Sequence, residues 1–171
     1  KAVDLKKGPR CCDLCNDDRY KELLREVVRR RVRFLHLGTP CTTFSSALRG
    51  KARKRSVANP VGPESTDRKI AEANLLVRRT VRLCKLVARM GGHWSIENPG
   101  NSLLWRFPDV VELARAGHFV RFDACAFGAK LPHEGFFRKR TKLLTNCGRL
   151  RSLARDCPRS HSHVELKGKF K

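Results

Sequence analysis

Two residues with side chains suited to covalent chemistry each stand directly after a predicted β-strand. Cys41 supplies a thiol and Glu97 a carboxyl group, and further along the chain Arg138 and Arg140 supply cations. A thiolate can add to an electron-poor ring carbon, an acid can hold and protonate a ring nitrogen, and a cation stabilises the developing charge. These residue types together are suited to nucleophilic chemistry through a bond to sulfur.

The periodicity of apolar residues predicts the elements that position these side chains. Predicted strands cover 2–5, 32–37, 94–96, 118–122 and 141–145; predicted helices cover 17–31, the segment from a Ser65 or Thr66 cap to the Gly91-Gly92 stop, 103–116 with a break at Pro108, and 150–154. Strands that alternate with helices favour an α/β fold with a mostly parallel sheet and helices on both faces. Sites in such sheets form at the carboxyl ends of the strands.

Five short motifs, in order along residues 2 to 146, resemble those of DNA cytosine-5 methyltransferases. Pro40-Cys41 resembles the nucleophile loop of that family, Glu97-Asn98 its base-gripping motif, and Arg138-Lys139-Arg140 its Arg-x-Arg motif. Upstream, Cys12-Asp13-Leu14 resembles the motif that contacts the adenine of S-adenosylmethionine, and Asp4 the acid that meets the ribose.

The resemblance implies a Rossmann-like, S-adenosylmethionine-dependent methyltransferase sheet. Cys41 would attack C6 of cytosine, Glu97 would hold N3 and N4, and Arg138 and Arg140 would support the charge. Asp4, Asp13 and Pro40 would bind the cofactor. We expect a partial catalytic domain at 1–146 and a basic extension with Cys and His residues at 147–171.

The chain departs from the family pattern at several positions. Thr42 follows Pro-Cys, Pro99 follows Glu-Asn, and Phe136 stands where the family has Gln. No glycine-rich loop precedes Asp4, and the region after 146 is short for target recognition. We therefore expect the first strand and glycine loop to be missing here and this piece alone to be inactive, its full-length parent being the enzyme.

Charge predicts a polyanionic partner. The chain of 171 residues has 38 Lys and Arg against 16 Asp and Glu, a formal net charge of +22. Such an excess favours nucleic acid, and we expect DNA, with RNA left open. A basic loop would contact phosphate through five residues: Arg49, Lys51, Arg53, Lys54 and Arg55.

The remaining signals concern metal and compartment. Cys147, Cys157, His161 and His163 are weak candidates for a zinc site, but their spacing matches no known finger, so we expect no metal. Eight irregularly spaced cysteines favour reduced thiols in an intracellular protein, nuclear or nucleoid if DNA is the substrate. No apolar run is long enough for a membrane span. Protein partners cannot be predicted.

Three interpretations stay open. The first is the methyltransferase. The second is a non-catalytic nucleic-acid-binding module that kept the fold and lost the cofactor site. The third is a basic, zinc-stabilised adaptor. Taken singly, Cys41 could be a small buried hydrophobe and Glu97-Asn98-Pro99 an ordinary turn.

Overall fold

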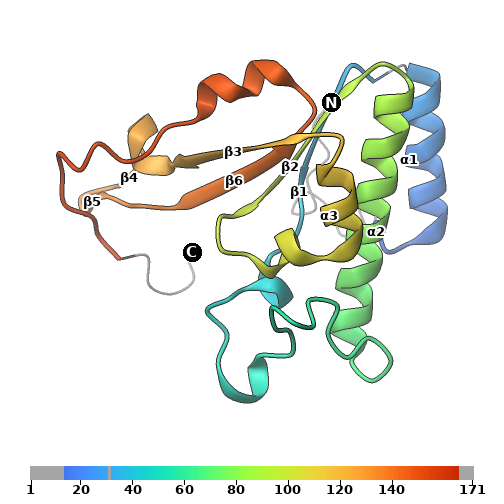
Figure 1. Ribbon diagram of the computed structural model, residues 1–171, viewed down its shortest axis with the longest axis horizontal. Helices are drawn as coiled ribbons and strands as arrows, with labels where there is room; N and C mark the ends of the chain where they lie inside the picture. The colour runs from blue at the N-terminus through green and yellow to red at the C-terminus, as the bar shows by residue number, and fades with distance from the viewer. Residues whose placement is uncertain (1–13, 31, 166–171) are drawn as a thin grey trace.

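The computed structural model describes residues 14–30 and 32–165 (Figure 1). These residues form a four-stranded sheet with helices packed against it. The strand order is β1-β2-β6-β3. These strands are β1 (Phe34–Gly38), β2 (His93–Pro99), β3 (His118–Asp123) and β6 (Arg140–Thr145). Two further strands, β4 (Lys130–Leu131) and β5 (Gly135–Phe136), form a separate two-stranded sheet. The α/β class predicted from the sequence is confirmed.

The sheet is mixed: β1, β2 and β3 run in one direction, as a mostly parallel sheet requires, and β6 runs against them. β1 pairs with β2 in parallel, but β6 lies antiparallel between β2 and β3. Periodicity locates strands without giving their direction or their order in the sheet. The predicted strand at 2–5 lies outside the described residues.

Within the described residues, three α-helices form at the predicted places. They are α1 (Asp17–Arg30), α2 (Arg68–Arg89) and α3 (Pro108–Ala114). The cap of α2 is Asp67, whose side chain accepts a hydrogen bond from Ile70 N, and not Ser65 or Thr66. Pro108 begins α3 because a proline at the first turn needs no backbone donor, and a 3-10 turn, η4 (Leu103–Arg106), precedes it.

The main core lies between β1, β2 and β6 on one side and α2, α3 and η4 on the other. Trp94, Ile96 and Leu144 from the sheet are at most 1% exposed and pack with apolar residues of α2 and α3, such as Val81 and Val110. α1 packs on α2 through a second cluster, which includes Val27 and Leu83. The helices α1, α2 and α3 thus form one layer on one face of the sheet, whereas helices on both faces were expected.

The segment after β6 packs back onto the sheet. It forms the 3-10 helix η6 (Gly148–Leu153), where a short helix was expected, and then isolated bridges between Phe122 and Arg155 and between Phe137 and Val164. The described part of the predicted 147–171 extension is therefore joined to the edge of the sheet. Among the described residues, no helix is long and apolar enough to cross a membrane.

Candidate active site

Cys41 is an exposed thiol at the carboxyl end of β1. Among the cysteines in the described part of the chain it is the exposed one, since Cys15 is intermediate and the other four are buried. It precedes a 3-10 turn, η2 (Thr42–Phe44), in which Phe44 N donates to Cys41 O at 3.0 Å. Phe44 is 1% exposed and packs edge-to-face on Phe107, so the turn that carries the thiol is anchored in the core.

Glu97 lies beside the start of the loop that carries Cys41. It is the register partner of Gly38, and a Cβ on Gly38 would lie 3.9 Å from Glu97 Oε2. Cys41 follows Gly38 by three residues, so their Cα atoms are at most about 11 Å apart. The structure therefore brings the thiol and the carboxyl group to one end of β1 and β2. Glu97 stands within β2 and not after it, because β6 extends the pairing of β2 as far as Pro99.

Asn98 ties the two motifs together. Its side chain is fully buried, and Nδ2 donates to Thr39 O at 2.7 Å. Trp105 Nε1 donates to Pro99 O at 2.8 Å and fixes the chain on the other side of Asn98. The strand that carries Glu97 thus holds the backbone two residues before Cys41.

The cation beside Glu97 is Lys139. Its Nζ lies 3.6 Å from Glu97 Oε1, and both side chains are partly exposed. Arg138 and Arg140, the cations expected at the site, both contact the buried carboxylate of Asp123. Side chains alternate along an extended chain, so Arg138 and Arg140 share one side and Lys139 takes the other.

Asp123 organises the arginine side of this arrangement. Burial alone would raise the pKa of its carboxyl group, but hydrogen bonds from Arg138, Arg140 and the backbone N of Cys157 outweigh burial and lower the pKa to about 2. Asp123 is fully buried and stays ionised at neutral pH. Arg138 and Arg140 therefore serve mainly to compensate a buried charge.

The expected cofactor residues are mostly outside the described part of the chain. Asp4 and Asp13 lie there, and Pro40 is exposed beside Cys41. The described residues therefore include Cys41, Glu97, Arg138 and Arg140 and, of the expected cofactor residues, only Pro40.

Arg55 is a structural residue, so its assignment to phosphate binding is wrong. It is 2% exposed, and its guanidinium donates to Pro60 O, Val61 O and Asn74 Oδ1 at 2.7 to 2.8 Å. It also stacks over Phe44, 3.8 Å from the ring centroid. Burial lowers its pKa to about 10, partly offset by nearby acids, so the group stays charged. Arg55 holds the basic loop against the turn that carries Cys41.

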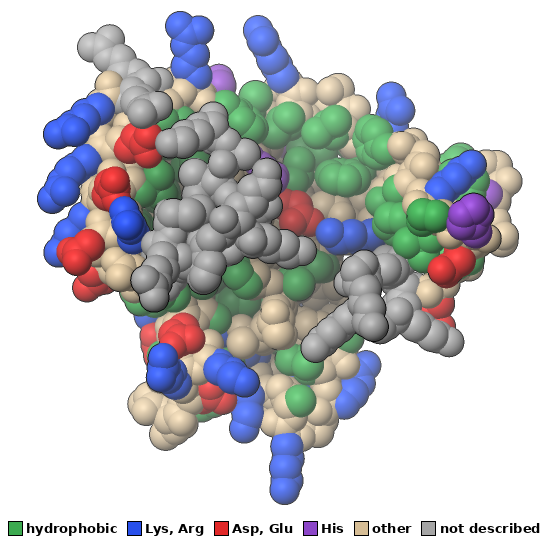
Figure 2. Space-filling view, turned by 180° about the vertical axis from the view of Figure 1, so that it is seen from behind, with side chains coloured by type: hydrophobic (Ala, Val, Ile, Leu, Met, Phe, Trp, Pro, Cys, Tyr) green, Lys and Arg blue, Asp and Glu red, His purple; other side chains and the backbone are tan. Residues whose placement is uncertain are grey.

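The four other basic residues of the loop are exposed: Arg49, Lys51, Arg53 and Lys54. They follow η2 closely along the chain and are carried by the loop that Arg55 anchors. Lys and Arg side chains also project around the rim of the face seen in Figure 2. This surface can attract a polyanion toward the thiol.

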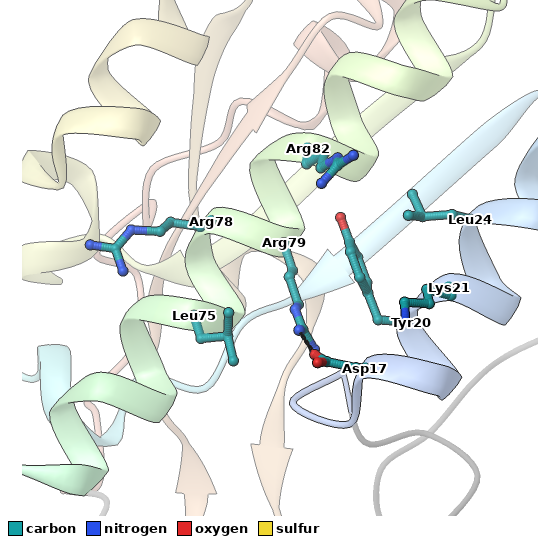
Figure 3. A pocket seen from close by; sticks show the side chains of 8 residues that line it. All are labelled: Asp17, Tyr20, Lys21, Leu24, Leu75, Arg78, Arg79 and Arg82. Atoms are coloured by element: carbon teal, nitrogen blue, oxygen red, sulfur yellow. Dashed lines mark hydrogen bonds and ion pairs between the residues drawn. The ribbon is translucent and has the colours of Figure 1, made fainter.

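A separate hollow of about 440 Å³ lies between α1 and α2 (Figure 3). Tyr20 and Arg79 point toward each other in it, and Arg79 also contacts Asp17. Burial raises the pKa of the Tyr20 hydroxyl, although Arg82 and Arg79 lower it. Its walls hold none of the predicted catalytic residues, so it is no part of the Cys41 site.

Three of the four weak zinc candidates come together, and the fourth does not. Cys157, His161 and His163 form a cluster whose remaining member is Cys125. Cys147 lies beyond Thr145, at the opposite end of β6 from the strand end that pairs with Asp123. The sequence did not indicate Cys125 as a member of the cluster in place of Cys147, because Cys125 is 32 residues upstream of Cys157.

The roles of Lys139 and Asp123 were also not predicted from the sequence. Alternation around the Arg-Lys-Arg run could have assigned Lys139 to the side opposite both arginines. Nothing in the sequence singles out Asp123, because an acid at the end of a strand is common at turns.

Comparison with known proteins does not add a relative. A scan against protein-family models finds no match, and searches of curated proteins and of solved structures find no similar protein. A functional assignment for this chain therefore depends on the residues and their geometry.

Proposed function

We propose that this chain carries the cytosine-binding portion of a DNA cytosine-5 methyltransferase-like domain. One observation carries the proposal: Glu97 is in register with Gly38, three residues before an exposed Cys41. A thiol and a carboxyl group on adjacent strand ends can address two positions of one pyrimidine ring. The fold proposed with this function is Rossmann-like.

The chemistry assigned to the chain is activation of the ring. The cytosine leaves the base stack to reach the thiol. Glu97 holds N3 and the exocyclic amine, and the proton that it shares with N3 draws electrons from C6. The Cys41 thiolate then adds to C6, and C5 becomes nucleophilic. Lys139 orients Glu97 through their contact at 3.6 Å.

S-adenosylmethionine would supply the methyl group that C5 accepts. Of the residues assigned to it, Asp4 and Asp13 lie outside the described part of the chain and Pro40 lies at the Cys41 loop. No step proposed here for Cys41 or Glu97 depends on how that cofactor binds. DNA as the substrate would place the protein in the nucleus or nucleoid.

Exchange of hydrogen at C5 tests the ring chemistry without a cofactor, so it can be measured in a piece of chain that is expected to be inactive in methyl transfer. Addition of Cys41 to C6 lets C5 take up a deuteron from D₂O. Loss of the original proton and departure of sulfur then leave cytosine labelled at C5. We expect mass spectrometry to detect this label in a cytosine-containing DNA oligonucleotide incubated with the protein, and an RNA oligonucleotide run in parallel reports the choice of nucleic acid.

Matched variants decide the result. Cys41→Ser should abolish exchange and Glu97→Gln should slow it by about two orders of magnitude. Cys15→Ser and Glu134→Gln, which alter a thiol and a carboxyl group elsewhere, should leave it unchanged. Exchange that survives Cys41→Ser would refute the assignment of the nucleophile.

A non-catalytic nucleic-acid-binding module is the second candidate, favoured by the four exposed basic residues of the loop that Arg55 anchors. It predicts retention of oligonucleotides at low salt together with no Cys41-dependent exchange at C5. An adduct between Cys41 and 5-fluorocytosine in DNA, formed with S-adenosylmethionine present, would exclude it, because fluorine blocks release of the sulfur.

A further inference from the structure

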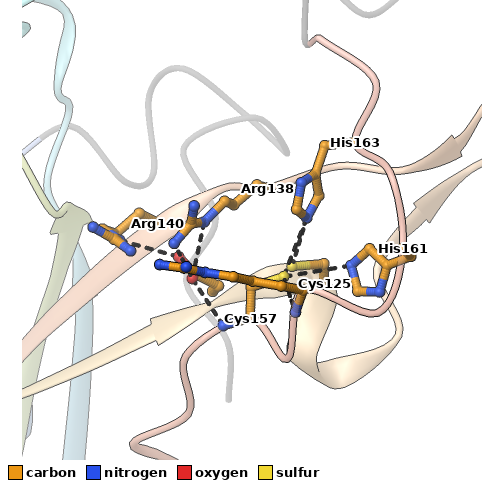
Figure 4. A network of polar contacts seen from close by, with 8 residues as sticks. Cys125, Arg138, Arg140, Cys157, His161 and His163 are labelled. Carbon is orange, nitrogen blue, oxygen red and sulfur yellow. Dashed lines mark hydrogen bonds and ion pairs between the residues drawn. The ribbon is translucent and has the colours of Figure 1, made fainter.

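A cluster of two thiols and two imidazoles lies beyond the end of β3 and β6 at which Asp123 pairs with Arg140 (Figure 4). Cys125 comes from η5 (Ala124–Phe127), the 3-10 turn that follows β3. Cys157, His161 and His163 come from the segment that returns along the sheet after η6. The potential ligand atoms of the four side chains all lie within 4.8 Å of one another.

We propose that Cys125, Cys157, His161 and His163 bind one Zn²⁺ ion in a structural site. This goes beyond the proposed function and does not depend on Cys41. It also replaces the sequence-based expectation that the chain has no zinc site, because the ligand set includes Cys125 in place of Cys147.

The spacing between ligand atoms fits a tetrahedral zinc site. Zinc lies about 2.3 Å from thiolate sulfur and about 2.0 Å from imidazole nitrogen, so a tetrahedron places sulfur and nitrogen about 3.5 Å apart. The cluster has Cys157 Sγ 3.6 Å from His161 Nε2 and 3.4 Å from His163 Nε2, and His163 Nε2 3.3 Å from Cys125 Sγ. All three distances agree with two ligands sharing one ion.

Surrounding groups hold the ligands in this arrangement. The His161 ring stacks on Phe136, with centroids 4.0 Å apart, which fixes the ring plane. Arg159 N donates to Cys157 Sγ at 3.3 Å, a contact that holds the sulfur in place. The backbone of Cys157 is itself fixed, because its N donates to Asp123 Oδ2 at 3.0 Å. Supporting contacts of this kind are typical of metal ligands.

The backbone at Arg159 also points to a built site. Arg159 has φ +58, a left-handed conformation that costs a non-glycine residue free energy. This turn brings the N–H of Arg159 onto the Cys157 sulfur and allows His161 to return toward it. A bound ion would supply the compensating stabilisation.

The nature of the ligands selects the metal and its role. Two sulfurs and two imidazole nitrogens in a tetrahedron favour zinc over magnesium or calcium, which take oxygen ligands. Four protein ligands fill the coordination sphere, as in structural sites, so no position is left for a reacting water. The ion would fasten the segment around 157–163 to the β3–β6 pair, where Arg138 and Arg140 also meet Asp123.

Metal analysis of the purified full chain tests the proposal. We expect one zinc ion per chain after extensive dialysis. Replacement by Co²⁺ should produce the visible d–d bands of a tetrahedral site together with thiolate-to-cobalt charge transfer. A spectrum without the charge-transfer band, or octahedral in form, would overturn the assignment.

Variants locate the site within the chain. The double variant His161→Gln/His163→Gln removes the two more accessible ligands and should weaken Zn²⁺ binding at least about tenfold. Cys157→Ser should do the same, whereas His93→Gln and Cys147→Ser should keep the affinity of the wild type. Circular dichroism checks that each variant is folded. Unchanged affinity in the folded double-histidine variant would refute the site.

Discussion

Asn98 Nδ2 donates to Thr39 O at 2.7 Å and so connects the strand that carries Glu97 to the loop that carries Cys41. The bond is fully buried on the Asn98 side. A buried amide that holds a carbonyl in this way fixes the relative positions of the two strands' ends. Asn98 thus acts as a positioning residue in the proposed site, because its side chain contacts the loop that carries Cys41.

Replacement of Asn98 should separate positioning from chemistry. Asn98→Ala leaves Thr39 O without its donor and should cost about 2 kcal/mol of unfolding free energy. We also expect the C5 exchange rate to fall at saturating oligonucleotide, while iodoacetamide still modifies Cys41. Peptide mapping follows the alkylation. Ser102→Ala, which removes the buried cap of η4, serves as a control for destabilisation alone; an equal loss of exchange there would argue against positioning by Asn98.

Lys139 lies beside Glu97, whereas Arg138 contacts Asp123, so we expect substitutions of these two residues to have different effects. Lys139→Met should lower the C5 exchange rate about tenfold, because it removes the cation next to the base-binding carboxyl group. Arg138→Met should instead lower the melting temperature, because it leaves Asp123 with fewer partners. The opposite pattern, with Arg138 controlling exchange and Lys139 controlling stability, would support the sequence-based expectation that Arg138 stabilises charge at the site.

The buried Arg55 and its exposed neighbours should differ in what they affect. Alanine at Arg49, Lys51, Arg53 and Lys54 together should reduce the salt slope of duplex DNA binding by about 3 to 4, since each phosphate contact contributes about 0.9. Arg55→Met should leave the slope unchanged and cost about 3 kcal/mol in unfolding free energy, because Pro60 O and Asn74 Oδ1 lose their donor and Val61 O loses one of two. Fluorescence anisotropy at a series of salt concentrations measures the slope, and urea unfolding measures the stability.

Sequence periodicity was enough to locate the main elements. The apolar spacing along α2 and the alternation in β1 reflect local geometry, so they can be read from the chain. Strand direction could not be read in this way: the antiparallel insertion of β6 depends on contacts between distant segments. Burial of Arg55 was hidden for the same reason, because its partners Asn74 and Val61 are brought to it only by the fold.

Some residues of the candidate sites could be predicted from the sequence and others could not. Cys41 and Glu97 follow from motif and strand position, and the structure brings both to one end of β1 and β2. Cys125 could not be found from spacing, because the turn after β3 and the returning segment are far apart in the sequence and are brought together only by the fold, where Phe122 pairs with Arg155. A metal site assembled from segments this far apart leaves no compact motif.

The low pKa of Asp123 predicts how stability responds to acid. The folded pKa is about 2, below the value of about 3.9 for an unfolded Asp, so the ionised carboxylate stabilises the fold above about pH 4. That contribution should be lost as the pH falls from about 4 to about 2. Asp123→Asn should remove this part of the acid dependence and lower the unfolding free energy at neutral pH by about 3 kcal/mol, because two arginines lose their buried partner.

The control is Asp156→Asn, which changes an exposed acid next to Cys157 and should leave both quantities close to those of the wild type. Urea unfolding across this pH range, with a chelator present so that release of metal does not contribute, measures the difference. If Asp123→Asn and the wild type lose stability in parallel between pH 4 and 2, the acid response must come from other carboxylates.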